Sequence, residues 1–469
     1  MKASTRHSVG KLRSAICQWV VRWCVSALLA LSVAGVTGAA AQTPVDIYNF
    51  GSISGDADQP FSPSVLVQGR DGNLYGTAQG GANGHGAVFR ITPTGVETLI
   101  YNFLPTDGND CYPGLTLGSD GNFYGVCYTG GANNSGAVYK ITPSGTFTLL
   151  HSFTGTGGEG AQPDAPPVQG KDGNYYGTTQ VGGGSGFGTI YKVTPSGTFT
   201  TIHSFSGPDG QQPIPGLVLG NSGSLYGAAI AGGSIGCGTI FQVNSAGTLT
   251  VLHNFTCTDG AFPLGVLIQG KDGNFYGTTE EGGTNGIGVV YKMTPSGSLT
   301  VLHNFVQTTD GELPQVGLVQ GTDGNLYGVS FGAGPNNLGT IFKVTTKGVF
   351  SVVYSFDGSV AENPASALLQ HTNGLLYGDT TNGGTSHAGI VYSFNRGAVP
   401  FCSLQTASGK IGAMIGVFGQ GFTSSSVAEF GGVSAAKVTL TGSTFLTATV
   451  PGGALTGSVT VTTGSTTLT

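Results

Sequence analysis

The sequence predicts an all-β fold: a seven-bladed β-propeller closed by its own N-terminal strand and followed by a small second β domain. Glycine supplies 84 of the 469 residues and charged residues only 9%, against usual shares of ~7% and ~25%. No stretch shows sustained helical periodicity, and a unit of about fifty residues recurs seven times, as in propellers and solenoids. The glycines follow no three-residue period, which excludes collagen. The 39% hydrophobic content argues against disorder.

Residues 1–41 have the pattern of a secretory signal peptide. Five basic residues precede an apolar run, Val25 to Val36, and Ala39-Ala40-Ala41 follows. We predict cleavage after Ala41; a membrane anchor is the alternative, but the run is short for a span of ~20 residues. The remaining chain has 12 basic and 23 acidic residues, a formal net charge of −11. This charge argues against nucleic acid or an anionic membrane as partner. The signal peptide predicts a secreted or cell-surface protein.

The repeat is marked by a Tyr-Gly pair. Around each pair lie four short segments rich in β-branched and aromatic residues, which predict four strands. Asp-Gly-Asn, as in 71–73, predicts a hairpin between the first two strands. Thr-Pro-Ser-Gly, as in 142–145, predicts a turn between the last two, and the middle connector is rich in glycine. The seven tyrosines, 49 to 52 residues apart, are Tyr75, Tyr124, Tyr176, Tyr226, Tyr276, Tyr327 and Tyr377.

The chain ends suggest how the ring closes. The fourth segment ends on the pattern Tyr or His, any residue, Phe in each of the first six units, as in 203–205. Unit seven stops at Tyr392 without this segment, whereas 46–50 is an orphan copy of it. We therefore predict that the N-terminal strand completes the last blade, which also hides open sheet edges. An unclosed solenoid is the alternative, and a variant of the ring starts every blade with this segment and needs no interlock.

The motif of the repeat resembles a known family. Residues 71–95 read Asp-Gly-Asn-Leu-Tyr-Gly-Thr, then Gly-Gly, then Gly-x-Val-Phe-x-Ile-Thr-Pro-x-Gly. This unit resembles the GloVer tandem-repeat family of exported bacterial proteins, and the resemblance covers about residues 45–396. It implies a surface or secreted repeat protein joined to varied anchoring modules, without an assigned activity.

Residues 399–469 form a separate segment rich in Ser, Thr, Gly and Val. Short strands are predicted within 412–422, 430–433 and 448–451. In order and spacing they resemble the IPT/TIG domain, which implies a small immunoglobulin-like β-sandwich serving as spacer or interaction module. Members of that family usually continue into a last strand past the point where this sequence stops. Whether the domain here lacks its last strand is therefore left open.

Two aromatic columns, a column being one position in successive repeats, invite functional interpretations. The Tyr of Tyr-Gly and the terminal Phe recur in all seven units, which favours packing between blades over a carbohydrate platform. Four histidines in one column suggest a metal ring, but tyrosine replaces them in other repeats. Neighbouring blades also lie far apart compared with a Zn–N bond of ~2.0–2.1 Å. We predict structural histidines and no metal site; they are His151, His203, His253 and His303.

The loop after each fourth strand carries an acid. A ring of carboxylates on one face would attract Ca²⁺ or cationic groups, but Asp-Gly is also ordinary turn chemistry, which we favour. The loops lack the D-x-[DN]-x-[DN]-G spacing of a dedicated calcium site. The column contains Asp56, Asp107, Glu159, Asp209, Asp259, Asp310 and Asp357. The candidate binding residues are Asp107, Glu159, Asp209, Asp259 and Asp310, with Glu280 and Glu281 from the middle loop of unit five.

Four cysteines lie in pairs around hairpins. Cys111 and Cys127 flank the first hairpin of unit two, and Cys237 and Cys257 flank the second hairpin of unit four. Counted outward from each turn, the members of a pair come close to facing one another. We predict both disulfides, which an exported protein can form, and leave Cys402 unpaired.

The motifs do not point to an enzyme. The sequence has no Gly-x-Ser-x-Gly, no His-Glu-x-x-His and no phosphate-binding lysine loop, so no catalytic residue is predicted. We favour a non-enzymatic secreted or cell-surface protein that binds glycans or proteins and needs no cofactor, Ca²⁺ being the one ion considered. The alternative is an extracellular polysaccharide lyase or glycosidase. It needs two acids about 5–10 Å apart, for which Glu280, Glu281 and Asp259 are the candidates.

Overall fold

The computed structural model describes residues 43–52, 66–359, 361–406 and 409–469. The predicted signal peptide and Asp56 lie outside the described residues. Within these ranges nearly all regular structure is β-strand, with one four-residue helix, α2 (Gln307–Asp310). No helix in the described ranges is both long and apolar enough to cross a membrane.

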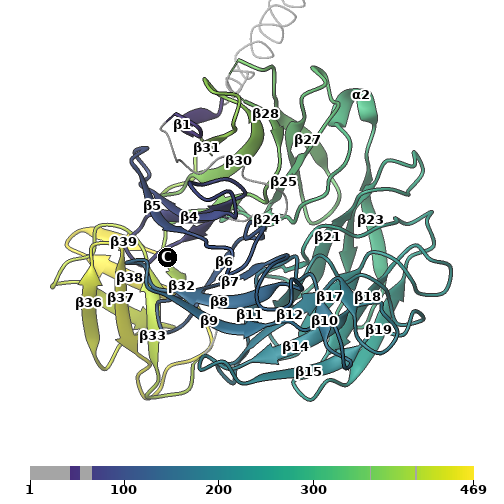
Figure 1. Ribbon diagram of the computed structural model, residues 1–469. Helices are drawn as coiled ribbons and strands as arrows, with labels where there is room; N and C mark the ends of the chain where they lie inside the picture. The colour runs from purple at the N-terminus through teal and green to yellow at the C-terminus, as the bar shows by residue number, and fades with distance from the viewer. Residues whose placement is uncertain (1–42, 53–65, 360, 407–408) are drawn as a thin grey trace, which may run out of the picture. The chain divides into compact units, whose positions relative to one another are not determined.

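Each repeat forms an antiparallel sheet, and in the first six repeats its four main strands pair in their order along the chain (Figure 1). The first strands are short: β2 (Val67–Gln68), β6 (Leu115–Leu117), β11 (Val168–Gln169), β16 (Leu217–Leu219), β20 (Ile268–Gln269), β24 (Val319–Gln320) and β29 (Leu369–Gln370). The second strands contain the Tyr-Gly pair: β3 (Leu74–Ala78), β7 (Phe123–Cys127), β12 (Tyr175–Thr179), β17 (Leu225–Ala229), β21 (Phe275–Thr279), β25 (Leu326–Ser330) and β30 (Leu376–Gly383).

The predicted third and fourth strands complete these sheets. The third strands are β4 (Ala87–Ile91), β8 (Ala137–Ile141), β14 (Thr189–Val193), β18 (Thr239–Val243), β22 (Val289–Met293), β26 (Thr340–Val344) and β31 (Ile390–Phe394). The fourth strands are β5 (Glu97–Asn102), β9 (Phe147–Ser152), β15 (Phe199–Ser204), β19 (Leu249–Asn254), β23 (Leu299–Asn304) and β27 (Phe350–Ser355). Additional short strands are β10 (Gly160–Ala161), β13 (Val181–Gly182) and β28 (Ala361–Pro364). We call the sheets 1 to 7 by repeat, sheet 7 being built from β28 to β31.

In sheet 7 the fourth position is filled by β1 (Val45–Asn49), which pairs with β31 (Figure 1). In sheet 3 the pairing of β14 with β15 contains a bulge that leaves Ile202 unpaired. The pairing of β31 with β1 contains the same bulge, at Ile47, and Tyr48 lies opposite Val391 as His203 lies opposite Ile190. β1 therefore occupies the place that the fourth strand has in the other repeats.

The hydrophobic core lies between consecutive sheets. Tyr176 of sheet 3 packs with Phe241 of sheet 4 in one buried cluster, and six further clusters join other pairs of sheets in the same way. One of them joins Tyr377 of sheet 7 to Phe89 of sheet 1. Every Tyr of the Tyr-Gly pairs and every terminal Phe is at most 4% exposed. The prediction that these two columns pack between sheets is confirmed.

The glycine of the Tyr-Gly pair makes room for an aromatic ring of the third strand. A Cβ at Gly177 would lie 2.8 Å from Cε1 of Tyr191 and closer still to its Cζ and hydroxyl. A Cβ at Gly227 would lie 2.6 Å from Cζ of Phe241. Because these rings are fully buried, an added methyl group has no free space to enter.

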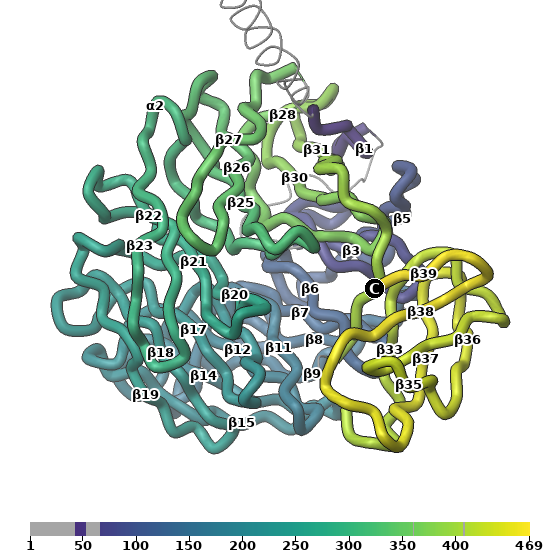
Figure 2. Tube along the Cα trace, turned by 180° about the vertical axis from the view of Figure 1, so that it is seen from behind, coloured from purple at the N-terminus to yellow at the C-terminus, as the bar shows by residue number. Residues whose placement is uncertain are grey.

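After the repeats, two further four-stranded antiparallel sheets form (yellow in Figure 2). One contains β32 (Ser403–Leu404), β33 (Met414–Phe418), β37 (Phe445–Thr449) and β36 (Val438–Gly442). The other contains β35 (Val433–Ser434), β34 (Val427–Phe430), β38 (Val459–Thr463) and β39 (Thr466–Leu468). Both sheets contribute to one buried cluster, with Val417 and Leu446 from the first and Ala428 and Val461 from the second.

Candidate functional site

The acids on the loops after the fourth strands bind groups of their own repeat. Asp209 accepts a hydrogen bond from the backbone N–H of Ser206 (2.8 Å) and lies 2.9 Å from Nε2 of His203. Although burial opposes it, these hydrogen bonds hold the pKa of Asp209 below its usual value. Equivalent contacts pair Asp107 with Tyr101, Glu159 with His151, Asp259 with His253 and Asp310 with His303. The carboxylates therefore cap their own turns, and the histidine column supplies the partner.

Asp357 departs from this pattern. Its side chain is exposed, and it accepts a hydrogen bond from the backbone N–H of Ser359 (3.0 Å). In the described ranges, no three His, Cys, Asp or Glu side chains gather closely enough to hold a metal ion.

The candidate acids for catalysis have three different environments. Glu280 accepts a hydrogen bond from Nε2 of Gln315 in the next repeat (2.8 Å). Glu281 is exposed, and its backbone pairs with Ala261. Asp259 lies 3.0 Å from His253 Nε2.

Two columns vary from repeat to repeat, and they lie at the same end of the sheets. One lies four residues after the Tyr of the Tyr-Gly pairs and the other twelve residues before it. Backbone pairs such as Asn109 with Thr129 bring the two segments together. The column after the second strand contains Gln79, Tyr128, Gln180, Ile230, Glu280, Phe331 and Thr381. The column before the first strand contains Tyr112, Asp164, Ile214, Leu264, Gln315 and Ala365.

In sheets 2 and 3 these columns bring together Tyr112, Tyr128, Asp164 and Gln180, which we call the tyrosine–aspartate cluster. The rings of Tyr112 and Tyr128 have centroids 6.4 Å apart and planes tilted by 32°. The Tyr128 hydroxyl donates to Oε1 of Gln180 (2.7 Å). Tyr112 is largely buried, while the other three side chains keep part of their surface exposed.

The electrostatics of this cluster are unusual. Burial raises the pKa of the Asp164 carboxyl to about 7. Oδ1 of Asp164 is inaccessible and has no hydrogen-bond partner among the described residues. Burial, and then the charge of Asp164, raises the pKa of the Tyr112 and Tyr128 phenols. The cluster therefore holds a carboxyl group that changes charge near neutral pH, a property common at functional sites.

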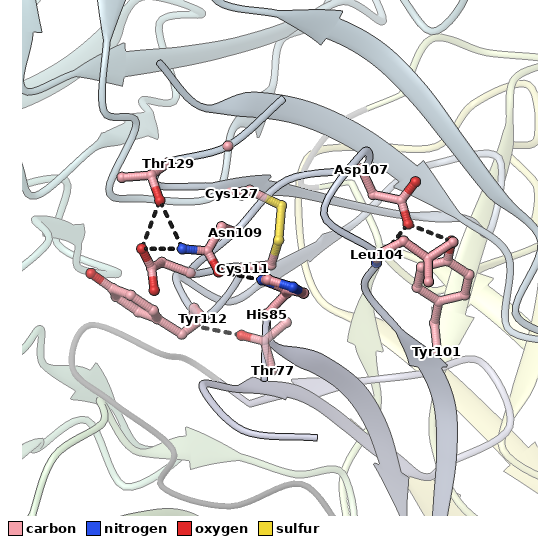
Figure 3. Close-up of a disulfide and its surroundings, with 12 residues drawn as sticks. Thr77, His85, Tyr101, Leu104, Asp107, Asn109, Cys111, Tyr112, Cys127 and Thr129 are labelled. Atoms are coloured by element: carbon pink, nitrogen blue, oxygen red, sulfur yellow. Dashed lines mark hydrogen bonds between the residues drawn. A yellow bond between two sulfur atoms is a disulfide. The ribbon is translucent and has the colours of Figure 1, made fainter. Parts of the chain in front are cut away.

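A disulfide holds the two tyrosines in place. Cys111 and Cys127, each immediately before one tyrosine, are joined as predicted (Figure 3). The Tyr112 carbonyl accepts a hydrogen bond from Oγ1 of Thr77 (2.7 Å) in sheet 1. The Tyr128 N–H donates to the backbone carbonyl of Asp110 (3.1 Å). The backbone on both sides of the tyrosine pair is therefore fixed.

The second predicted disulfide, Cys237–Cys257, is also present, and Cys402 is unpaired and buried. Cys402 lies in the C-terminal segment, with Sγ 3.4 Å from the Val459 carbonyl.

The repeat pattern did not predict the tyrosine–aspartate cluster. Glu280 and Glu281 stand out in the sequence because they break the pattern of their middle loop. Tyr112, Tyr128 and Asp164 lie in two columns that vary throughout, and this variability is the one signal that the sequence offers for them. Their proximity depends on how sheets 2 and 3 pack.

Comparison with known families shows to which family this chain belongs. Residues 35–169 and 162–392 match the model of the Gloeobacter/Verrucomicrobia repeat. The chain belongs to this repeat family. The Gloeobacter/Verrucomicrobia match covers sheets 1 to 7 apart from the end of β31, and it agrees with the resemblance inferred from the sequence. No curated protein matches the chain in sequence.

Among solved structures, similar chains include a puromycin hydrolase, with 12% identity and a TM-score of 0.47, covering 81% of this chain and 59% of that chain. The BP39L lectin from Burkholderia pseudomallei has 11% identity and a TM-score of 0.47, with 73% and 97% covered. An ulvan lyase has 12% identity and a TM-score of 0.44, with 76% and 96% covered. Likenesses this distant carry no argument about function.

Proposed function

We propose that this protein is an exported, non-enzymatic glycan-binding protein built on a closed seven-bladed propeller. The observation that carries the proposal is the tyrosine–aspartate cluster, where two tyrosines and two polar side chains from the two variable columns meet. Aromatic rings beside hydrogen-bonding groups suit sugars, which present apolar ring faces and hydroxyl groups. The disulfide next to both tyrosines favours binding because it orders the site before the ligand arrives.

Closure of the propeller is supported by three contacts. β1 pairs with β31 in the register of a fourth strand. Tyr377 of sheet 7 shares a buried cluster with Phe89 of sheet 1. The turn glycine Gly95 of sheet 1 abuts the carbonyl of the bulged Ile47, as Gly197 abuts the carbonyl of Leu150 between sheets 3 and 2.

Export and domain organisation complete the proposal. Residues 1–41 are the proposed signal peptide, and the two disulfides fit an oxidising compartment. Residues 399–469, with two sheets around one core, are proposed to be an IPT/TIG module that acts as a spacer.

Binding is tested with the chain from Gln42 onward on a glycan array and by retention on insoluble polysaccharides. We expect at least one glycan to be retained, and replacement of both Tyr112 and Tyr128 by Ala to weaken retention at least tenfold. Phe187→Ala, a half-buried aromatic of a middle loop, serves as the matched control. Repeating the assay with calcium tests the acids Asp107, Glu159, Asp209, Asp259 and Asp310. If no glycan is retained under either condition, the proposed function is wrong.

A second candidate, a polysaccharide lyase or glycosidase, is favoured by one observation. A carboxyl group with a pKa of about 7, like that of Asp164, can donate a proton at neutral pH. Incubation of the retained polysaccharide with the protein, followed by analysis for new chain ends, tests this candidate. If the wild type cleaves the polysaccharide and Asp164→Asn does not, the protein is an enzyme that uses Asp164, and the proposed non-enzymatic function is wrong. Cleavage lost instead in a Glu280→Ala, Glu281→Ala double variant would place the chemistry in the middle loop.

A further inference from the structure

The tyrosine–aspartate cluster contains a carboxyl group that lacks a charge partner. None of the ion pairs among the described residues involves Asp164. Burial accounts for its raised pKa. One carboxyl oxygen is inaccessible and has no hydrogen-bond partner within the described ranges, while the side chain as a whole remains partly exposed. Such a carboxyl group takes up either a proton or a cation.

The surroundings of Asp164 suit a cation of a particular kind. The rings of Tyr112 and Tyr128 lie with their centroids 6.4 Å apart, and, besides burial, the charges of Asp164 and Asp110 both raise the pKa of the two phenols. An ammonium group is attracted to the face of an aromatic ring within about 6 Å and pairs with a carboxylate. A metal ion would need more oxygen ligands, and no group of three acids, histidines or cysteines lies here in the described part of the chain.

We propose that the tyrosine–aspartate cluster binds the ammonium group of an amino sugar, so that the glycan carries unacetylated hexosamine units. This inference rests on the proposed function. Gln180, whose Oε1 accepts a hydrogen bond from the Tyr128 hydroxyl, can donate from its side-chain amide group to sugar hydroxyls. A lysine side chain carries the same charge but lacks these hydroxyls. The acidic chain and the Asp164 carboxylate disfavour glycans with uronic acids.

The main test is calorimetry with glucosamine oligomers, either free of acetyl groups or fully N-acetylated, at pH 6.5. We expect the free-amine oligomer to bind at least tenfold more tightly. Asp164→Asn keeps the size of the side chain and removes its charge, so it should abolish this preference. Asp357→Asn removes an equal charge from an exposed loop and should leave the preference intact. Circular dichroism checks that both variants are folded.

A second measurement does not depend on variants. With an oligomer carrying fixed trimethylammonium groups, the ligand charge is the same at pH 6 and pH 8. Because Asp164 has a pKa of about 7, its ionised fraction rises about tenfold over this interval, and affinity should rise by about the same factor.

The outcomes separate the two proposals. Equal affinity for acetylated and free-amine oligomers overturns the ammonium site while leaving glycan binding intact. Binding of oligolysine in preference to the amino sugar overturns the assignment of the ligand to glycans. Absence of binding to every glycan removes the proposed function itself.

Discussion

In the Tyr-Gly pair, the tyrosine position needs a large side chain and the glycine position has no room for a side chain. Tyr176 fills the space between sheets 3 and 4, and its hydroxyl donates to Oδ2 of Asp172 in the Asp-Gly-Asn turn (2.9 Å). Gly177 leaves room for the ring of Tyr191 from the third strand. The same residues therefore join a turn, a strand and the next sheet, which explains why the motif recurs without variation.

Gly177→Ala should destabilise the protein by about 1–3 kcal/mol, because the new methyl group meets a ring that cannot move aside. Gly184→Ala, in the middle loop of the same sheet, has no atom within 4 Å of the new methyl group and should cost less than about 0.5 kcal/mol. Thermal and urea unfolding measure both effects. Equal effects of the two substitutions would contradict the packing role.

At the scale of a strand pair, two hairpins carry a disulfide that the other repeats do not have. Cys111–Cys127 joins residues 16 positions apart, and Cys237–Cys257 joins residues 20 positions apart. Other repeats have no cysteines at these places. The first disulfide adjoins the tyrosine–aspartate cluster, so in the proposed function it orders the ligand site as well as stabilising the hairpin.

Replacement of Cys111 and Cys127 by Ser should cost about 3 kcal/mol, since a loop of this length regains freedom in the unfolded state. Unfolding with and without reductant measures the loss. Cys402→Ser is the control, because Cys402 has no disulfide partner. Reductant should lower the unfolding midpoint of the wild type and of the control. A double variant as stable as the oxidised wild type would argue against the bond.

For the seven repeats as a whole, the free energy of unfolding depends on whether sheets 1 and 7 are joined. Phe50 is fully buried in the cluster that joins sheets 7 and 1, as Phe205 is buried between sheets 3 and 4. A closed ring gives both residues equivalent surroundings, whereas an open solenoid leaves Phe50 at a free end.

Phe50→Ala should therefore cost as much as Phe205→Ala, about 3–5 kcal/mol. Chemical denaturation of the two variants under the same conditions gives the comparison. An effect of Phe50→Ala within about 0.5 kcal/mol of zero, alongside a large effect of Phe205→Ala, would show that the N-terminal strand adds little and that the ring is open.

Local sequence patterns predict the repeat, its four strands and the turns between them, because Tyr-Gly, Asp-Gly-Asn and the terminal Phe act locally and recur. They also predict both disulfides, since the cysteines of each pair come close to facing one another across a hairpin. Only the tertiary structure brought Tyr112, Tyr128, Asp164 and Gln180 together, because they come from different repeats and their contacts depend on how sheets 2 and 3 pack. The pKa of Asp164 likewise follows from burial by groups distant in sequence, which no local pattern records.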